Sequence, residues 1–385
     1  MKSRLRFVGL QILLVVVVLV GLDLAGNAAR AISFEYEQWA RALRADAVIP
    51  QEAPGPRFVA ENLAWRYIEF YTMKPHFAWG REYRMDGFGL RASADGAVSF
   101  DRHDEQACRK VWFFGGSTTM GTGLPATSTL PALLQERLNA RGGERFCVFN
   151  LGMASQESTQ ELLLFYEMLQ RGFRPQVVIF YDGINEAFYE RPSAGLASTP
   201  IWQVRGLGPM QVQAMNSASP LLRWRAAASE ASGLVWLAQQ VRATWLTRPA
   251  TSPGDVAVLE RQMATMMEHY RMNVRLLRGM ATDLGIRAFF FWQPAMSYDL
   301  HAGRRALTER ERVMWDEYGK PDEHLRHVAF ARHRATTSFE DFPVFDVSDV
   351  FAGVREQVYM DPRHPNSRGN ALIADRLHAV LAERL

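Results

Sequence analysis

A serine follows two glycines at the end of an apolar run, in the stretch FFGGSTTMG (113–121). Gly115 and Gly116 allow the backbone to turn sharply where a strand would end. Ser117 then lies at the rim of a sheet, and its own amide points into the same space. A nucleophile needs that exposure, together with hydrogen-bond donors for the charge that develops on the attacked oxygen. Ser117 is therefore a candidate nucleophile; the alternative is that Ser117 or Thr118 only caps a helix.

An aspartate and a histidine lie close together near the end of the chain, in the stretch YMDPRHPN (359–366). Asp361 precedes His364 by three residues, and the two prolines of the stretch prevent a regular helix. A tight loop with this spacing can bring a carboxylate onto the imidazole that it orients. The imidazole of His364 can then take the proton of the Ser117 hydroxyl.

Two other apolar runs end in residues that can donate hydrogen bonds. The stretch NLGMAS places Gly152 just past the second run, and YDGINE places Gly183 and Asn185 just past the third. A glycine amide and an asparagine side-chain amide are donors suited to an oxyanion hole. These strand ends therefore strengthen the interpretation of Ser117 as a nucleophile.

Two other well-defined motifs do not fit the serine stretch. A nucleophile elbow requires glycine two residues after the serine, where this chain has Thr119. A phosphate-binding loop requires lysine directly after its second glycine. Gly116 and Gly121 have the spacing, but Thr122 takes the place of the lysine.

In chain order, FGGSTT, NLG, DGINE and DPRH resemble the four conserved blocks of the SGNH (GDSL-type) hydrolases. The resemblance covers about residues 110–385. It extends upstream to DGFGLRA (86–92), which is similar to a turn found in membrane-anchored members, some of them encoded with exopolysaccharide or capsule pathways. The implied fold is a flavodoxin-like three-layer α/β/α sandwich with a five-stranded parallel sheet.

The resemblance also implies roles for five residues. It implies Ser117 as the nucleophile, His364 as the base and Asp361 as the residue that orients His364. It further implies an oxyanion hole made by the Ser117 amide, Gly152 and Asn185. The chain departs from the family pattern in the first block, where Gly-Asp-Ser becomes Gly-Gly-Ser. The missing aspartate is not a member of the triad, so activity is not excluded.

Two polar residues at strand ends are candidates for substrate contact. Glu186 stands where many family members carry aspartate, and with Asp182 it forms either an acid pair or structural hydrogen bonds. Gln293, in FWQPAM, either faces the pocket or belongs to a turn fixed by the proline that follows. His324 and His327 have the spacing of metal ligands but fit a solvated, charged helix face better. No metal or cofactor is expected.

The fold prediction rests on apolar strands that alternate with helices from residue 110 onward. The predicted strands are 110–114, 146–150, 177–181, 288–292 and 344–347. The predicted helices are 130–140, 159–171, 256–284 and one that begins near residue 366. This alternation implies an α/β fold with a parallel sheet covered on both faces, and with ligands at the carboxyl ends of the strands. Two insertions, at about 187–255 and 303–340, follow strand ends, where lids and substrate-binding loops belong.

The amino terminus is typical of a membrane or export segment. Lys2, Arg4 and Arg6 precede an uncharged, largely apolar run over residues 7–22. The basic flank predicts that the amino terminus stays inside and that the catalytic domain is extracytoplasmic, hence periplasmic in a Gram-negative cell. We expect an uncleaved single-pass anchor; the alternative is a signal peptide cleaved at the small residues 26–28.

Length and composition predict a folded chain of several parts. The 385 residues are 48% hydrophobic and 22% charged. A net charge of +3 gives little reason to expect nucleic acid as a partner. The expected parts are an anchor or signal segment (1–24), a juxtamembrane helix, linker and accessory segment (25–108), and a hydrolase domain (109–385).

The two cysteines, Cys108 and Cys147, each lie just before an apolar residue run. If those runs are adjacent parallel strands, the two thiols start side by side. In an exported protein they can then form a disulfide. Two unrelated core cysteines are the alternative.

Together these features predict a serine ester hydrolase that acts outside the cytoplasmic membrane through a Ser-His-Asp triad and an acyl-enzyme. The family resemblance makes O-acetyl groups of carbohydrate the expected substrate. The expected partners are the membrane, through residues 7–22, and polysaccharide-synthesis proteins. An acyltransferase would use the same triad with a sugar hydroxyl in place of water. A catalytically silent assembly component remains a further alternative, because the first block lacks its aspartate.

Overall fold

The protein is described by a computed structural model that forms two compact units. One unit comprises residues 1–47 with 207–250, and the other comprises residues 48–206 with 251–385. The structure describes residues 11, 14–29, 65–68, 72–75, 84–140, 142–153, 156–188, 232, 253–318, 321–339 and 343–385. Most of the first predicted insertion, and much of the predicted linker and accessory segment, lie outside the described residues.

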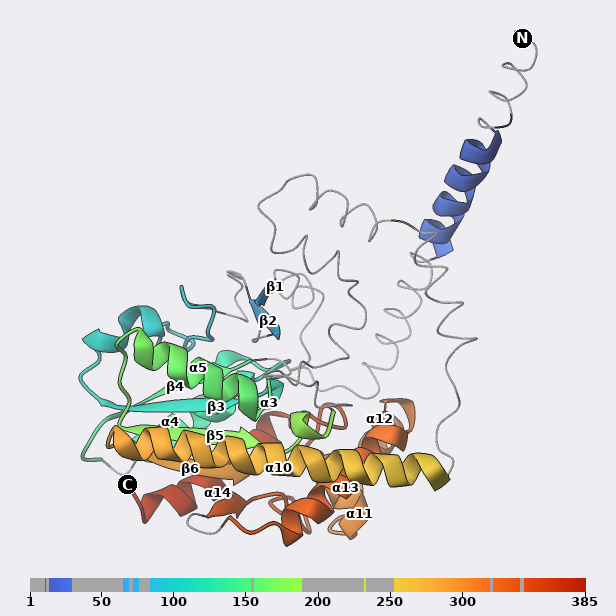
Figure 1. The fold of residues 1–385 in the computed structure, drawn as a ribbon. Coiled ribbons are helices and arrows are strands. Elements are labelled where there is room, and N and C mark those ends of the chain that lie inside the picture. The colour runs from blue at the N-terminus through green and yellow to red at the C-terminus, as the bar shows by residue number, and fades with distance from the viewer. Residues whose placement is uncertain are drawn as a thin grey trace. The chain divides into compact units, whose positions relative to one another are not determined.

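In the first unit, residues 14–29 form a helix whose apolar side chains are largely exposed (Figure 1, blue). Leu14 retains 63% of its accessible surface and Leu24 retains 65%. Asp23 accepts hydrogen bonds from Ser232 at 2.6 Å and from Asn27 at 3.2 Å. Within the described residues, which leave out 1–10, 12 and 13, no helix combines the length and the apolar character needed to cross a membrane.

The second unit is built on a sheet of five parallel strands. They are β3 (Arg109–Gly115), β4 (Phe146–Gly152), β5 (Val177–Asp182), β6 (Arg287–Trp292) and β7 (Val344–Asp346). Their order in the sheet is β4-β3-β5-β6-β7. The five predicted strands are therefore confirmed, in the order of flavodoxin-like folds. From β3 the chain first adds β4 on one side and then returns to add β5 on the other. Ligands are therefore expected in the crevice between the carboxyl ends of β3 and β5.

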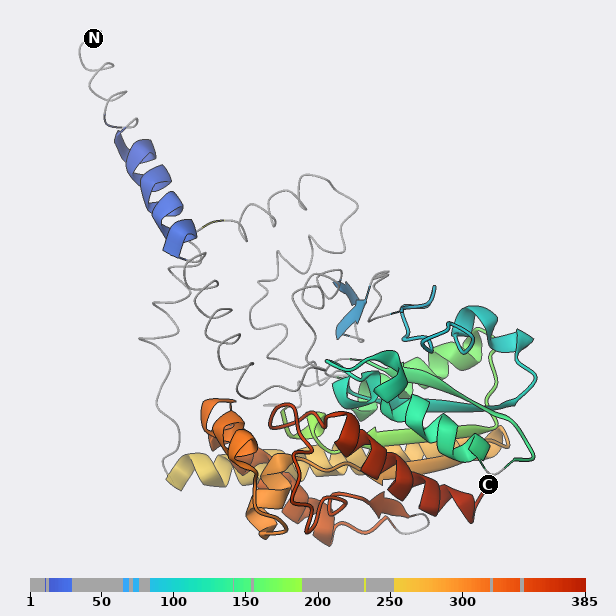
Figure 2. The ribbon, with the colours of Figure 1, turned by 180° about the vertical axis from the view of Figure 1, so that it is seen from behind.

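Helices cover both faces of this sheet, as Figures 1 and 2 show from opposite sides. One face carries α5 (Ser158–Gln170) and α10 (Pro253–Asp283), and the other carries α4 (Leu130–Ala140) and α14 (Ser367–Ala382). All four were predicted from the sequence with bounds that differ by three residues or fewer. The three-layer arrangement is thus built from amphipathic helices that each bury one side.

Strand side chains alternate between the two faces, as a doubly covered sheet requires. In β3, Trp112 and Phe114 belong to the core beneath α5 and α10, whereas Phe113 belongs to the core beneath α4 and α14. Phe114, Phe180 and Phe290 stack across three neighbouring strands, with ring centroids 4.8 and 5.2 Å apart. This aromatic row fixes the registers of β3, β5 and β6, and hence the level at which each strand ends.

The second predicted insertion is helical. It follows α11 (Met296–Ala302) and contains α12 (Glu309–Tyr318) and α13 (Pro321–Thr336). Helix α13 packs against α10 and α11, and its Ala329 and Phe330 are fully buried in the core beneath α10. This segment is therefore a packed part of the unit and not a detached loop.

The segment before β3 carries a hairpin, a turn and a disulfide. Strands β1 (Trp65–Ile68) and β2 (Thr72–Pro75) pair in antiparallel fashion. Cys108 and Cys147 form a disulfide, with Cα atoms 5.8 Å apart. Cys147 lies opposite Lys110 of β3, and Cys108 precedes Lys110 by two residues, so the two cysteines lie at the starts of neighbouring parallel strands, as the sequence suggested.

Candidate active site

Two glycines allow helix α3 (Ser117–Met120) to begin directly after β3. Gly115 has a φ of +153°, which L side chains rarely adopt, and a Cβ there would overlap the Thr119 side chain. A Cβ on Gly116 would overlap the side-chain amide of Asn185. The glycines therefore bring Ser117 against the end of β5. Because Ser117 is the first residue of α3, its amide has no acceptor within the helix.

Asp361 and His364 lie on a loop between β7 and α14 that is closed by hydrogen bonds. Met360 N donates to His364 O at 2.8 Å, which closes the loop. Within it, Asp361 Oδ1 accepts the amides of Arg363 at 2.8 Å and of His364 at 2.9 Å. The backbone thus holds the carboxylate and the imidazole in a fixed relation.

Ser117, His364 and Asp361 form one continuous chain of hydrogen bonds. His364 Nε2 lies 2.7 Å from Ser117 Oγ, and His364 Nδ1 lies 2.7 Å from Asp361 Oδ2. An ionised carboxylate can only accept, so Nδ1 carries a proton and donates it to Asp361. Nε2 is then the ring nitrogen that accepts from the serine hydroxyl. This tautomer is the one in which an imidazole can remove the serine proton.

Asp361 is held in its ionised form. Burial opposes ionisation, but the His364 imidazole and the hydrogen bonds from that ring and from the amides of Arg363 and His364 outweigh it. They lower the pKa of Asp361 well below its usual value. The Asp361 side chain retains 43% of its accessible surface, so solvent also helps to stabilise the charge. A carboxylate in this state stabilises the imidazolium that forms when His364 takes a proton.

The amide of Asn185 lies beside the serine helix. Asn185 is the first residue of the 3-10 helix Asn185–Phe188, which follows β5. Its Nδ2 donates to Gln156 O at 2.5 Å and touches the position where a Gly116 Cβ would stand. That hydrogen bond uses one of the two amide hydrogens, and the part of the chain that the structure describes gives the second no acceptor, so it can serve a bound oxygen.

The expectation that Gly152 donates to an oxyanion is wrong. Its amide donates to Asn150 Oδ1 at 2.9 Å, inside the fold. Gly152 instead allows close packing, because a Cβ there would overlap the backbone of Thr119 and Met120. The glycine of the second block thus lets α3 rest directly on β4.

Gln293 and Glu186 are buried and not open to a substrate. Glu186 is 1% exposed, and its carboxylate accepts the amides of Gly183 at 2.8 Å and of Ser158 at 3.1 Å. Gln293 is 2% exposed, and its Oε1 accepts the Thr118 hydroxyl at 2.8 Å. Substrate contact was therefore the wrong interpretation of both residues. Both make structural hydrogen bonds at strand ends, and Gln293 supports the residue next to Ser117.

Glu186 belongs to a buried acidic cluster at the end of β5, with Glu161 and Asp182. None of the three is more than 3% exposed. Burial raises the pKa of Glu161 and of Asp182 well above the usual range, and repulsion between neighbouring carboxylates raises it further. Burial raises the pKa of Glu186 as well. The cluster therefore holds protons and carries less negative charge than three carboxylates would.

Three residues that contact the site or its supports were not identified from the sequence. Thr118 was considered only as a helix cap, and Arg91 lies in DGFGLRA, which was noted only for its resemblance. Glu311 lies in a charge-dense stretch that gives no signal of burial, yet it is 0% exposed. His327 was expected on a solvated helix face. It is 2% exposed, and its Nδ1 lies 2.9 Å from Ser297 Oγ.

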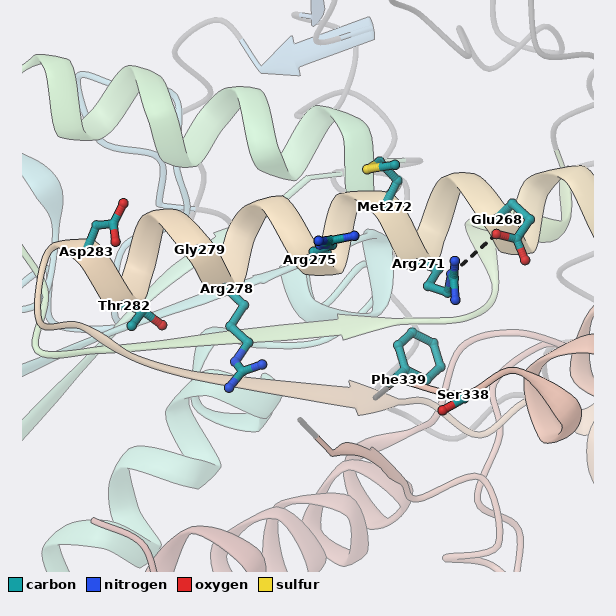
Figure 3. Close-up of a pocket in the computed structure, with 10 residues that line it drawn as sticks. All are labelled: Glu268, Arg271, Met272, Arg275, Arg278, Gly279, Thr282, Asp283, Ser338 and Phe339. Atoms are coloured by element: carbon teal, nitrogen blue, oxygen red, sulfur yellow. Dashed lines mark ion pairs between the residues drawn. The ribbon is translucent and has the colours of Figure 1, made fainter. Parts of the chain in front are cut away.

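A cavity of about 390 Å³ lies along the outer side of α10, away from these residues (Figure 3). Arg271, Arg275 and Arg278 line it at helical spacing, with Phe339 opposite them. Arg271 pairs with Glu268 at 3.3 Å. The described residues that line this cavity include none of the predicted site residues.

No protein-family model and no curated protein sequence matches the chain. Among solved structures it is similar to a member of the lipolytic protein G-D-S-L family from Veillonella parvula, with 10% identity, coverage of 72% of this chain and 99% of that one, and a TM-score of 0.37. It is also similar to the lipase Lip_vut3 from a goat rumen metagenome, with 13% identity, coverage of 70% and 96%, and a TM-score of 0.38. A third is a two-domain esterase (CEX) active on acetylated mannans, with 14% identity, coverage of 74% and 51%, and a TM-score of 0.34.

Proposed function

We propose that the protein is a serine ester hydrolase in which Ser117, His364 and Asp361 act as a catalytic triad. The continuous hydrogen-bond chain carries this proposal, with 2.7 Å between Ser117 Oγ and His364 Nε2 and 2.7 Å between His364 Nδ1 and Asp361 Oδ2. Ser117 and His364 are 247 residues apart in sequence, and parallel strands that end at one edge bring them together. A helix cap alone would not require a histidine and an aspartate in this geometry.

The reaction would proceed in two balanced steps. Ser117 Oγ gives its proton to His364 Nε2 and attacks the ester carbonyl carbon. The bond from that carbon to the alcohol oxygen then breaks, and the alcohol leaves with the proton from His364. In the second step, water gives a proton to His364 and attacks the acyl-enzyme. Ser117 recovers its proton as the carboxylic acid leaves.

Two donors can stabilise the oxyanion in both steps. The Ser117 amide has no acceptor in α3, and it carries the positive end of that helix turn. The second Nδ2 hydrogen of Asn185 lies at the same end of β5. Removal of one such donor typically costs about 10²–10³ in kcat. The protonated acidic cluster nearby would add little repulsion against the developing charge.

We place the proposed activity outside the cytoplasmic membrane. Three features support this location: the basic residues before position 7, the exposed apolar helix over residues 14–29, and the Cys108–Cys147 disulfide. Disulfides form and persist mainly in oxidising compartments. The proposed substrate is an O-acetylated carbohydrate, on the strength of the sequence resemblance alone.

Hydrolysis of 4-nitrophenyl acetate by the full-length protein tests the proposal. We expect Ser117→Ala to lower kcat by about 10³-fold or more, because the nucleophile is lost. Fluorophosphonate should label the wild-type protein at Ser117 and leave the variant unlabelled. Equal hydrolysis by the two proteins would refute the proposal. Release of acetate from an O-acetylated oligosaccharide, compared with transfer of acetyl to an unacetylated one, then separates hydrolase from transferase.

A further inference from the structure

The DGFGLRA stretch precedes the sheet in sequence, yet its arginine reaches the helix that carries Ser117. Arg91 Nη1 donates to Met120 O at 2.8 Å and to Gly121 O at 2.6 Å. Arg91 Nη2 donates to Leu124 O at 2.6 Å. The arginine is only 3% exposed, so one buried guanidinium binds the last carbonyl of α3, the carbonyl of its capping residue Gly121, and the carbonyl of Leu124 in the turn that follows.

Helix α3 needs such external support because it is only four residues long. A helix of that length is not stable alone, since its hydrogen bonds cannot repay the cost of nucleation. Its last carbonyls lack donors within the helix and carry the negative end of its dipole. A planar guanidinium with five donors can bind several of these carbonyls together and neutralise their charge. The side chain of Asn150 adds one more donor, to Thr119 O at 3.0 Å.

Arg91 is itself held by a rigid turn. Asp86 Oδ1 accepts the amides of Phe88 and Leu90, both at 2.9 Å, and Oδ2 accepts the amide of Phe100 at 3.0 Å. The backbone of Arg91 also forms a β-bridge with Asn150 of β4. The turn is thus fixed to the same strand on which α3 rests. Its arginine has a defined position relative to α3.

We propose that Arg91 is a positioning residue for Ser117, and that the turn at residues 86–92 belongs to the active-site framework. The proposal rests on the proposed function. With a rise of about 1.5 Å per residue, Ser117 lies only about 4.5 Å along the helix from Met120. A shift at the carboxyl end of α3 is therefore a shift of the serine hydroxyl. Misplacement by about 1 Å can cost roughly 100-fold in rate.

The test compares Arg91→Ala and Arg91→Lys with Asn139→Ala in the full-length protein. Asn139 exchanges two hydrogen bonds with Phe146, at the opposite end of β4, so its loss should lower stability without moving α3. We expect Arg91→Ala to lower kcat for 4-nitrophenyl acetate by about 10- to 100-fold with KM within about twofold of wild type. Arg91→Lys, which offers a point charge in place of the fork, should have a kcat between those of Arg91→Ala and wild type. Millimolar guanidinium should restore part of the kcat of Arg91→Ala and none in the control.

Hydrogen exchange gives a readout that does not depend on activity. The amides of Met120, Gly121 and Thr122 close the turn of α3, so a peptide covering residues 117–124 should exchange faster in Arg91→Ala than in wild type or Asn139→Ala. Unchanged exchange there would overturn the proposal, as would a kcat loss no larger than that of the control and not rescued by guanidinium. If wild type and Ser117→Ala were equally inactive, the proposed hydrolase function would fail, and exchange would still decide whether Arg91 holds α3.

Discussion

The candidate site is assembled from two arms that use opposite chemistry to hold the backbone. The serine arm is α3 with the turn that follows it to residue 124, and the buried cation Arg91 binds three of its carbonyl oxygens. The histidine arm is the loop over residues 358–366, whose amides are bound by the buried anion Glu311. Glu311 Oε1 accepts Val358 N at 3.0 Å and Tyr359 N at 3.3 Å. Each arm thus presents one kind of unsatisfied backbone group and meets a side chain of the matching charge.

The histidine arm is also held through the side chain of Tyr359, two residues before Asp361. Its hydroxyl donates to Asp299 Oδ2 at 3.1 Å, and the Arg305 guanidinium lies 6.0 Å from its ring. Arg305 pairs with Glu311, and both side chains are fully buried. Glu311 belongs to α12, within the insertion predicted at about 303–340, where lids and substrate-binding loops belong. In the structure, this helix braces the loop that carries Asp361 and His364.

The spacing of these backbone groups explains why the serine arm needs fewer charged supports than the histidine arm. The end of α3 and the turn after it expose carbonyls in a small space, so a single guanidinium fork reaches three of them. The loop of the histidine arm exposes its amides at intervals, so Glu311 and Asp361 each bind only two of them. The histidine arm therefore uses several supports, namely Glu311 and Asp299 from outside and Asp361 from within.

Loss of a triad member in the histidine arm should give the largest effect. We expect His364→Ala and Asp361→Asn each to lower kcat by about 10³- to 10⁴-fold, the first by removing the base and the second by allowing the wrong tautomer. Steady-state hydrolysis of 4-nitrophenyl acetate measures both. The double variant should be little worse than His364→Ala, because the two residues act through one imidazole. Additive losses would contradict a single relay through the histidine arm.

Glu311→Gln should give the next largest effect. It leaves Arg305 as a buried cation without its anion, which typically costs about 3–5 kcal/mol of unfolding free energy. Denaturant-induced unfolding measures this loss. In the double variant Arg305→Met with Glu311→Met, no charge remains buried, and much of the stability should return.

Activity should not return in that double variant, because the amides of Val358 and Tyr359 still lack their acceptor. We expect kcat to remain about tenfold or more below wild type, while KM changes little. Recovery of kcat together with stability would show that Glu311 has no positioning role. The histidine arm would then not depend on Glu311 for its position, in contrast to the proposed dependence of the serine arm on Arg91.

The pH dependence of stability should separate the arms through Asp86 and Asp361, which both accept amides of their own loops. Burial, aided by the nearby Asp101, raises the pKa of Asp86 from 3.8 to about 6. Between these values the native state holds a proton that the unfolded chain releases, so this contribution to stability falls as pH rises from about 4 to 6. The shift corresponds to roughly 3 kcal/mol. The lowered pKa of Asp361 acts in the opposite sense, so its contribution is present above the unfolded value and is lost as pH falls below it.

Unfolding free energies from pH 3 to 7 test this contrast. Asp86→Asn should flatten the decline between about pH 4 and 6, and Asp361→Asn should flatten the loss below about pH 4. Other buried acids, such as Asp299 with a pKa raised to about 6, contribute equally to wild type and variants and cancel in the difference. If both variants changed the same part of the profile, the assigned directions would be wrong.

The sheet and its helices were predictable because each depends on a local pattern. Apolar runs of five to seven residues between turn residues specify buried strands, and period-3.6 patterns specify the helices that cover them. The position of Ser117 followed from this level as well, since two glycines at a strand end allow the sharp turn that leads directly into α3. The short spacing in DPRH likewise predicted the contact between Asp361 and His364.

The errors arose where one hydrogen-bond partner replaced another. Gly152 is in the predicted place, but whether its amide faces the site or Asn150 depends on a side chain that the local pattern does not orient. Gln293 and Glu186 are polar residues at strand ends, and only the packing of α3 and α5 over them decides that they are buried. Arg91 and Glu311 gave no periodic signal, because a buried charge is specified by its partners and not by its neighbours in sequence.

Local sequence patterns were enough to predict the order of strands and helices along the chain, the sheet edge at which the candidate residues gather, and which serine, histidine and aspartate they are. Short-range forces suffice for this, since turn chemistry and hydrophobic periodicity act over a few residues. The tertiary fold, in contrast, brings the histidine to hydrogen-bond distance from the serine, sets which donors lie near it, and sets which buried charges hold the two arms. Those outcomes depend on contacts between residues tens to hundreds of positions apart, and no local pattern encodes them.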